Sequence, residues 1–379
     1  MRKAPFLYLS AFLMDGGLAL ASLCIPLLAI RVGGTYDDLG ALRATHSLTY
    51  ALGAFWLGRL ADRIGYQRSM AACCLLLVPV FAGYYYVSAV WQLFGLALLT
   101  GIATCAFWPS LQAWLAEGQR SDGLRRRIGS FNMSWSLGMV VGPGLAGALY
   151  AAYAGLSFAL LAALFFAMFV GVVLLQVRED GREQGNETET ETASLAAARI
   201  FLPVAWIANF STYFAIGIVR SLFPKLATDL GVQTAHLGYL MALIGLAQLA
   251  TFALISRTER WQFRLWPLVA VQLAAMLALG VLAFSTSLIA FAGGLLLLGV
   301  MIGFTYTASG FYSLHSTAPG GGRIGIHETI LGGGNLVGPL AGGLVGEYIG
   351  ARAPYMLAAG VIAIALAAQA IYLRRARTS

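Results

Sequence analysis

The sequence has little charge for its length. Only 11% of its 379 residues are charged and 59% are hydrophobic, whereas a soluble domain is about 25% charged. The mean hydropathy is +0.77, and apolar runs of about twenty residues recur, each long enough to cross about 30 Å of hydrocarbon as a helix. The composition excludes an ordinary soluble protein and predicts an all-α membrane protein.

Cysteine and the common chemical motifs are scarce too. The four cysteines, Cys24, Cys73, Cys74 and Cys105, all lie inside apolar runs, which is typical of packing residues and not of a disulfide framework or a metal site. No phosphate-cradling Gly-x-x-x-x-Gly-Lys, metal-spaced His/Cys set or nucleophile motif occurs. We therefore expect no metal, no cofactor and no enzyme activity, and an ATP-driven pump is disfavoured.

Positive charge is unevenly distributed. The net charge of +8 would suggest nucleic acid in a soluble protein, but here the basic residues lie in short loops between apolar runs. With both termini in the cytoplasm, all but five of the 24 Lys and Arg residues fall on the inner side; the five are Arg31, Arg43, Arg220, Lys225 and Arg352. The positive-inside rule then predicts a multi-pass protein of the cell (inner) membrane with cytoplasmic termini. We expect the lipid bilayer, not nucleic acid, as its surroundings.

The apolar runs number twelve. Six precede and six follow a hydrophilic, acidic segment at 178–198, which we interpret as a cytoplasmic linker between halves at 1–177 and 199–379. The predicted spans are 5–30, 38–57, 69–89, 92–116, 129–152, 155–177, 199–223, 235–256, 265–284, 287–312, 325–346 and 353–373.

The two halves resemble each other. A shift of 198 positions places Pro26 on Pro224 and Gly33 on Gly231. A shift of 196 places Gly138-x-x-x-Gly142-Pro143 on Gly334-x-x-x-Gly338-Pro339. Six spans, a linker and six related spans in the same orientation predict two pseudo-symmetric six-helix halves.

Two motifs carry a resemblance to a known family. Gly58-x-x-x-Asp62-Arg63-x-Gly65, followed by Arg68, resembles the signature loop of the major facilitator superfamily of secondary transporters. The segment from Gly138 to Gly147 resembles the fifth-span motif of its drug-proton antiporter branch, and the likeness in span number, repeat and linker covers essentially the whole chain.

The chain also departs from the family pattern. Tyr66 and Gln67 stand where the loop usually has two basic residues. In the fourth span, Gly101 matches the antiporter motif, but Ala97 replaces the arginine expected four residues earlier. These departures leave the mode of transport open.

The resemblance implies gating roles. The loop residues Gly58, Asp62, Arg63, Gly65 and Arg68 would clasp the halves and release on switching; the alternative is a charged loop that anchors the chain at the membrane surface. Glycines four apart allow close helix packing, and a proline bends a helix. The two Gly-Pro segments could therefore act as hinges or as static packing; their residues are Gly138, Gly142, Pro143, Gly338 and Pro339.

Ionisable residues inside spans are candidates for proton coupling. A mid-membrane carboxylate such as Asp15 costs about 2.5–3.5 kcal/mol on insertion scales, so it should face a cavity or a partner. The alternative is a structural hydrogen bond to a neighbouring helix. His327 and Glu328 begin the eleventh span and could also titrate, or Glu328 could contact Arg323 or the signature loop.

Aromatic and amide side chains in the spans suit an organic substrate. The alternative is packing or an interfacial belt. The candidates are His46, Trp108, Gln112, Asn132, Trp135, Asn209, Tyr213, Tyr306 and, near the end of its span, Tyr312.

Together these features predict a secondary active transporter that works by alternating access as a monomer. We expect proton-coupled export of small organic or amphipathic molecules, with protons and a small-molecule substrate as its partners. One alternative is proton-coupled uptake or facilitated diffusion of a polar nutrient. Another is a non-transporting membrane scaffold or sensor.

Overall fold

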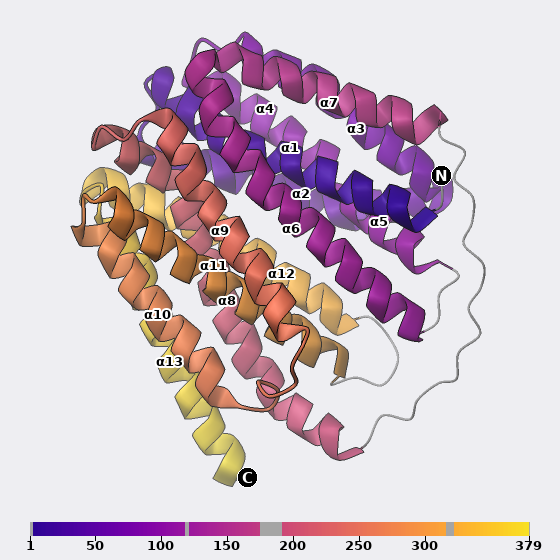
Figure 1. The fold of residues 1–379 in the computed structure, drawn as a ribbon, viewed down its shortest axis with the longest axis vertical. Coiled ribbons are helices and arrows are strands. Elements are labelled where there is room, and N and C mark those ends of the chain that lie inside the picture. The colour runs from indigo at the N-terminus through magenta and orange to yellow at the C-terminus, as the bar shows by residue number, and fades with distance from the viewer. Residues whose placement is uncertain (1–2, 118–120, 175–191, 316–321, 379) are drawn as a thin grey trace. The chain divides into compact units, whose positions relative to one another are not determined.

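The computed structural model describes residues 3–117, 121–174, 192–315 and 322–378. These residues form helices and short connections, with no strand among them (Figure 1). The helices are α1 (Lys3–Arg31), α2 (Tyr36–Ile64), α3 (Tyr66–Tyr85), α4 (Val90–Cys105), α5 (Phe107–Ala116), α6 (Ser121–Ala152), α7 (Ala154–Leu174), α8 (Thr192–Asp229), α9 (Thr234–Ile255), α10 (Leu265–Phe284), α11 (Leu288–His315), α12 (Gly322–Tyr348) and α13 (Ala353–Thr378).

The helices confirm the all-α prediction. Ten stretches of the described chain are long and apolar enough to cross a membrane, with α4 and α5 counted together. The charged α2 and the glycine-rich α12 coincide with the two remaining predicted spans. Residues 178–191 of the predicted linker lie outside the described residues, and α8 begins at Thr192, seven residues before the predicted seventh span.

The fourth predicted span is interrupted. α4 ends at Cys105, Ala106 separates the two helices, and α5 begins at Phe107. Pro109 explains the break, because its nitrogen carries no hydrogen to donate to the carbonyl of Cys105. Within α5 the proline falls in the first turn, where that missing donor is tolerated.

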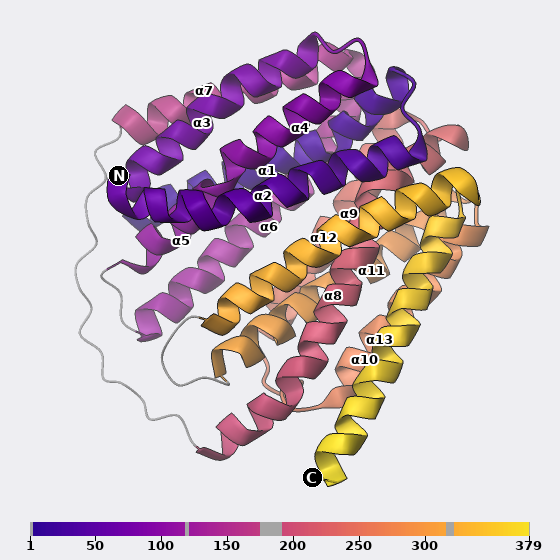
Figure 2. The ribbon, with the colours of Figure 1, turned by 180° about the vertical axis from the view of Figure 1, so that it is seen from behind.

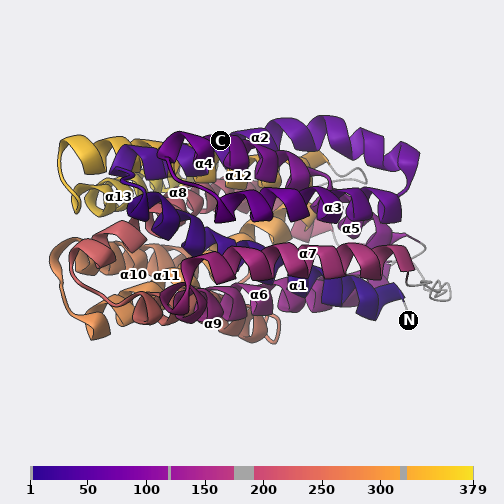
Figure 3. The same ribbon diagram turned by 90° about the horizontal axis from the view of Figure 1, so that it is seen from above.

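The described residues form two compact units. One holds the described residues of Met1–Gly34, Thr45–Glu187 and Val232–Ala242; the other holds those of Thr35–Ala44, Thr188–Gly231 and Leu243–Ser379. In the first unit α1 packs on α6, and α3 lies alongside α7 (Figure 3). In the second unit α8 packs on α12, and α13 runs along α8 and α10 (Figure 2). The units follow the sequence halves with two exceptions. The start of α2 belongs to the second unit, and the start of α9 belongs to the first.

Glycines end equivalent helices in the two halves. Gly33 follows α1 with φ 88° and Gly231 follows α8 with φ 78°, both in the left-handed region that favours glycine. The amide of each donates back to the last turn of its helix, to Ile30 and Thr228 respectively. The repeat predicted from sequence thus extends to local backbone geometry.

Two equivalent helix pairs, α3 with α7 and α10 with α13, are stabilised by different contacts. Between α3 and α7 two aromatic pairs stack, Phe81 on Phe165 with centroids 5.1 Å apart and Tyr84 on Phe158 at 5.4 Å. Between α10 and α13, Gln272 and Gln369 are fully buried and exchange two hydrogen bonds of 3.2 and 2.9 Å. The same architecture is therefore stabilised by aromatic contact in one half and by amide pairing in the other.

Candidate functional site

The two Gly-Pro segments bring helices into backbone contact. A Cβ added at Gly138 would lie 2.6 Å from the amide nitrogen of Gly16 on α1, and one at Gly142 would overlap the carbonyl oxygen of Gly16. In the second half, a Cβ at Gly338 would overlap the carbonyl oxygen of Phe214 on α8. Only glycine fits at these crossings, so close packing of α6 on α1 and of α12 on α8 is built into the sequence.

Further glycines of α6 and α12 approach the starts of α9 and α2. A Cβ at Gly147 of α6 would lie 2.8 Å from the Cα of Gly238, near the start of α9. A Cβ at Gly343 of α12 would lie 2.7 Å from the carbonyl oxygen of Tyr36, at the start of α2. The predicted motif residues Pro143 and Pro339 lie inside α6 and α12, beside these crossings.

The signature loop is a turn between α2 and α3. Gly65 has φ 91°, a conformation that other residues rarely adopt, and it separates Ile64 from the first residue of α3. Arg63 and Arg68 are exposed on either side. The side chains at Gly58 and Asp62 fall outside the described residues, so their predicted gating roles stay predictions.

One departure from the family pattern has a structural partner. Gln67 stands where a basic residue was expected, and its Nε2 donates 2.6 Å to the carbonyl oxygen of Val172 near the end of α7. The amide thus satisfies one of the terminal carbonyls of a helix.

Asp15 lies in the middle of α1 and is partly buried. Its neighbour Gly16 meets Gly138 of α6, and a Cβ at Gly138 would lie 3.2 Å from the carbonyl carbon of Asp15. The glycine crossing therefore fixes the level of this carboxylate along α6. Position 213 is its equivalent in the second half, where Tyr213 of α8 meets Gly334 of α12.

His327 belongs to a buried cluster on α11 and α12. Its side chain is 3% exposed, its Nδ1 lies 2.7 Å from the Oγ of Ser309, and its ring meets Tyr306 edge-on with centroids 5.1 Å apart. The side chain of Glu328, the next residue, is exposed at the surface of the protein. Of the predicted residues, the structure thus brings His327 and Tyr306 together, and it adds Ser309, which sequence reasoning missed.

A buried polar row on α8 and α11 continues from this cluster. Thr305, one turn from Ser309, donates 3.0 Å to Thr212 of α8. Asn209 lies one turn before Thr212, is fully buried, and neither polar atom of its amide has a hydrogen-bond partner among the described residues. A buried amide in this state is a place for a bound water or a polar ligand atom.

The predicted substrate residues of the first half are partly assembled. Trp108 of α5 meets Phe131 of α6 edge-on with centroids 6.2 Å apart. One turn along α6, the Nε1 of Trp135 donates 3.0 Å to the Oδ1 of Asn132. Gln112 is exposed on α5. His46 stacks on Tyr50 at 6.5 Å within α2.

Tyr312 has a structural contact instead. Its hydroxyl accepts a 2.8 Å hydrogen bond from the amide of Phe263, and its ring packs among aromatic side chains that include Phe201 and Trp261. This cluster closes the connection between α9 and α10, where Phe263 has φ 54°. The hydrogen bond and the ring contacts of Tyr312 therefore support a structural role.

Sequence reasoning also missed a polar cluster at the start of α2. The hydroxyl of Tyr36 donates 2.9 Å to Asp229 of α8, and its amide donates 3.0 Å to Glu347 of α12. Lys225 pairs with Asp229 at 3.6 Å and lies over the Tyr36 ring. The i, i+4 spacing of Lys225 and Asp229 was a readable signal; nothing in the sequence pointed to Tyr36.

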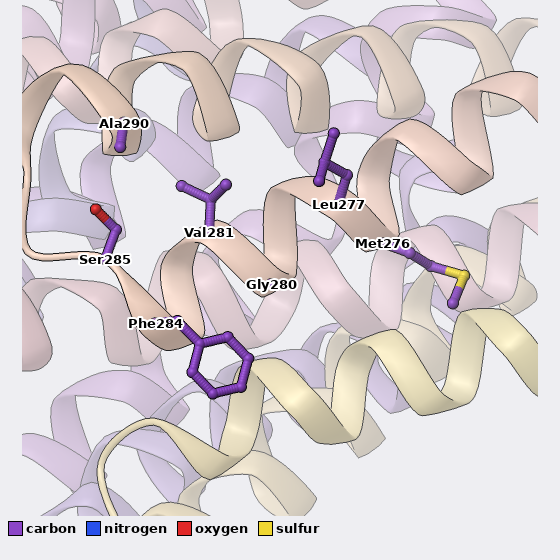
Figure 4. Close-up of a pocket in the computed structure, with 7 residues that line it drawn as sticks. All are labelled: Met276, Leu277, Gly280, Val281, Phe284, Ser285 and Ala290. Carbon is purple, nitrogen blue, oxygen red and sulfur yellow. The ribbon is translucent and has the colours of Figure 1, made fainter.

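An apolar groove lies along the C-terminal part of α10 (Figure 4). It has a volume of about 690 Å³, and its side chains Leu277 and Phe284 are largely exposed. None of the predicted substrate residues lines it, and its surface suits lipid tails. The lining residues are Met276, Leu277, Gly280, Val281, Phe284, Ser285 and Ala290.

Comparison with known proteins finds bacterial transporters. The chain is 33% identical over 136 residues to the multidrug resistance protein MdtG of Dickeya zeae, covering 34% of this chain and 33% of that protein. It is 31% identical over 160 residues to MdtG of Escherichia fergusonii, where it spans 39% of that protein. The chain thus matches little more than a third of these relatives. It is 24% identical over 362 residues to the uncharacterized MFS-type transporter YqjV of Bacillus subtilis, covering 88% of this chain and 84% of that one.

Solved structures share the fold over the whole chain. The inward-facing, unoccupied structure of a bacterial homologue of the human lysosomal transporter Spinster matches with a TM-score of 0.75 at 14% identity, covering 99% of this chain and 96% of that one. The nucleoside transporter NupG matches with a TM-score of 0.69 at 13% identity, covering 98% and 99%. The sequence profile of the Major Facilitator Superfamily matches residues 7–321 and 205–379. The chain therefore belongs to the Major Facilitator Superfamily and is a multi-pass membrane protein.

Proposed function

We propose that this protein is a transporter that couples proton movement to the export of small organic or amphipathic molecules by alternating access. The observation that carries the proposal is Asp15, a carboxylate in the middle of α1 that the glycine crossing with α6 holds at a fixed level. A charge at this depth is costly to insert, and this cost favours a functional role. The multidrug resistance relatives support export, over the part of the chain that they match.

The other assignments follow from this proposal. Asp15, His327 and Glu328 are the candidates for carrying protons, and the aromatic and amide side chains around Trp108 and Asn132 are candidates for substrate contact. The signature loop and the Gly-Pro helices would control switching. In this proposal, the protein lies in the inner membrane as a monomer. Both termini would lie in the cytoplasm, because the distribution of basic residues favours that orientation.

Reconstituted vesicles test the proposal. With ethidium as the probe, an acidic lumen should drive dye into vesicles whose protein exchanges protons for dye. Asp15→Asn should abolish this accumulation and keep downhill dye movement, because the amide keeps the shape of the carboxylate and carries no proton. Met14→Leu, which changes the buried neighbour of Asp15 on α1 and nearly keeps its volume, is the control and should retain accumulation.

Uptake or facilitated diffusion is the second candidate. It is favoured by Ala97, a buried alanine on α4 at the position where the antiporter motif has arginine. Dye or nutrient movement that ignores the imposed pH gradient would support it and contradict proton coupling. If no compound moves in a broad screen in either direction, the scaffold alternative replaces both.

A further inference from the structure

The two halves place different chemistry at one equivalent contact. Trp108 of α5 meets Phe131 of α6 with an interplanar angle of 70°. In the second half, Tyr306 of α11 meets His327 of α12 at 66°. The shift of 198 relates Trp108 to Tyr306, and the shift of 196 relates Phe131 to His327. The same edge-on contact thus holds an apolar ring in one half and an imidazole in the other.

The position equivalent to Ser309 differs in the same way. Leu111 is fully buried on α5, and its equivalent on α11 is Ser309, also fully buried. Apolar side chains fill such a position without a desolvation cost, whereas a buried hydroxyl and imidazole must satisfy each other. The first half shows that the fold packs well with the apolar set, so packing alone does not require the polar pair.

We propose that His327 carries a coupled proton in addition to the one on Asp15, and that Ser309 is the positioning residue of His327. The inference rests on the proposed proton coupling. In the tautomer that serves this role, Nδ1–H donates to the Ser309 Oγ, and the Nε2 lone pair takes a proton from hydronium, which leaves water and an imidazolium. The hydrogen bond to Ser309 is made through Nδ1, so the ring can take up its second proton at Nε2. Release of that proton to water returns the neutral ring, and the Oγ accepts from Nδ1 in both states.

Among the described residues, the hydrogen bond and the ring contact of His327 are with uncharged side chains, Ser309 and Tyr306, and Glu328 is its chain neighbour. No ion pair joins His327 to a described charged side chain of α8, α11, α12 or α13, the helices packed together here. Those charged side chains are Arg199, Arg220, Lys225 and Asp229 on α8, Glu328 and Glu347 on α12, and Arg374 and Arg375 on α13.

Histidine nitrogen NMR of the full-length protein in lipid nanodiscs tests the proposal without a substrate. His327, assigned by loss of its signals in His327→Gln, should show the Nδ1–H tautomer and change to the imidazolium pattern as the pH is lowered over the range in which the protein stays folded. Ser309→Ala should remove the tautomer preference. Ser136→Ala, a fully buried serine of α6, should leave it unchanged. A ring that stays neutral over that range overturns the proposal.

Transport in vesicles gives the second readout. His327→Gln should abolish pH-driven ethidium accumulation, Ser309→Ala should lower its rate about tenfold through loss of a hydrogen bond to a charged group, and Ser309→Thr should restore it. The double change Ser309→Leu with His327→Phe copies the first half and should fold well yet lose coupling. Full coupling in His327→Gln overturns the inference and leaves the proposed function intact. A wild-type protein that ignores the gradient contradicts the proposed function, while the NMR titration still decides whether His327 takes up a proton.

Discussion

The two halves of the chain place glycine at the same helix crossings. Gly138 of α6 meets the turn of α1 from Phe12 to Gly16, and Gly334 of α12 meets the turn of α8 from Phe210 to Phe214. Gly101 meets the carbonyl of His46, and Gly299 meets the carbonyl of Ile244. These pairs are related by the shifts seen in the sequence, so the repeat conserves close backbone approach where only glycine fits.

Two ionisable residues inside the spans do not follow the repeat. Asp15 has Tyr213 as its equivalent, and His327 has Phe131. The shared positions define the scaffold, whose helices must pack in the same way in both halves. At the two positions named above, an ionisable group in an apolar helix costs free energy in one half, and an uncharged side chain replaces it in the other. The comparison therefore separates the residues of the fold from the candidates for chemistry.

The largest expected effect tests whether the glycine crossings are equivalent. Gly142→Ala and Gly338→Ala each place a Cβ on a backbone carbonyl of the facing helix, and a rigid backbone has no rotamer with which to avoid it. We expect each to abolish transport and to destabilise the protein by about 1–3 kcal/mol or more. Thermal unfolding in detergent and vesicle transport would measure the two effects.

Two glycines of the same helices serve as controls. An added Cβ at Gly332 meets nothing within 4 Å, and one at Gly144 comes only to 3.8 Å from Ala242. Alanine at either position should be neutral or slightly stabilising, because it favours the helix over glycine. Tolerance of Gly142→Ala beside failure of Gly338→Ala would break the equivalence of the halves.

An intermediate effect concerns the amide pair between α10 and α13. Gln272→Leu leaves the buried Gln369 amide without its partner, and we expect a loss of about 1–2 kcal/mol. The double change of both residues to Leu should cost less than the sum of the single changes, because no polar group is then left unpaired. The position equivalent to Gln272 is the buried Cys74 on α3. There the free-energy cost of Cys74→Ala should simply add to the cost of a second substitution on α7. Additive single and double changes would mean that the amides do not stabilise each other.

The sequence allowed the scaffold to be predicted in detail. Span length and the repeated glycines are local patterns, and each has one physical cause that composition or spacing can reveal. The break at Ala106 was missed because apolar residues continue across it, although Pro109 was a signal.

The candidate site could be predicted only in part, because its side chains come from different helices and contact one another only in the folded protein. Asp15 and His327 were found as ionisable residues in apolar runs. Ser309 was missed, since a serine in a membrane helix is unremarkable until its partner is known. The same holds for Tyr36, whose partners lie about two hundred and three hundred residues away in the chain.

The smallest expected effect concerns the exchanged helix starts. The start of α2 is fixed by the Tyr36 hydroxyl on Asp229, whereas the start of α9 is fixed by the close approach of Gly147 to Gly238. Tyr36→Phe should destabilise the protein by about 1 kcal/mol, and Lys225→Met, which removes a partly exposed pair, by about 0.5 kcal/mol or less.

The Tyr36 contact should also depend on pH. Burial, together with the hydrogen bond to the Asp229 carboxylate, raises the pKa of Tyr36 above its ordinary value. Because the folded state then holds the phenol proton more tightly than the unfolded chain, the stabilisation is present below about pH 10 and is lost as the pH rises further. Thermal unfolding measured across this range should show a weaker alkaline decline in Tyr36→Phe than in the wild type. Equal declines would mean that Tyr36 is not held by Asp229, and that the starts of α2 and α9 are both fixed by packing alone.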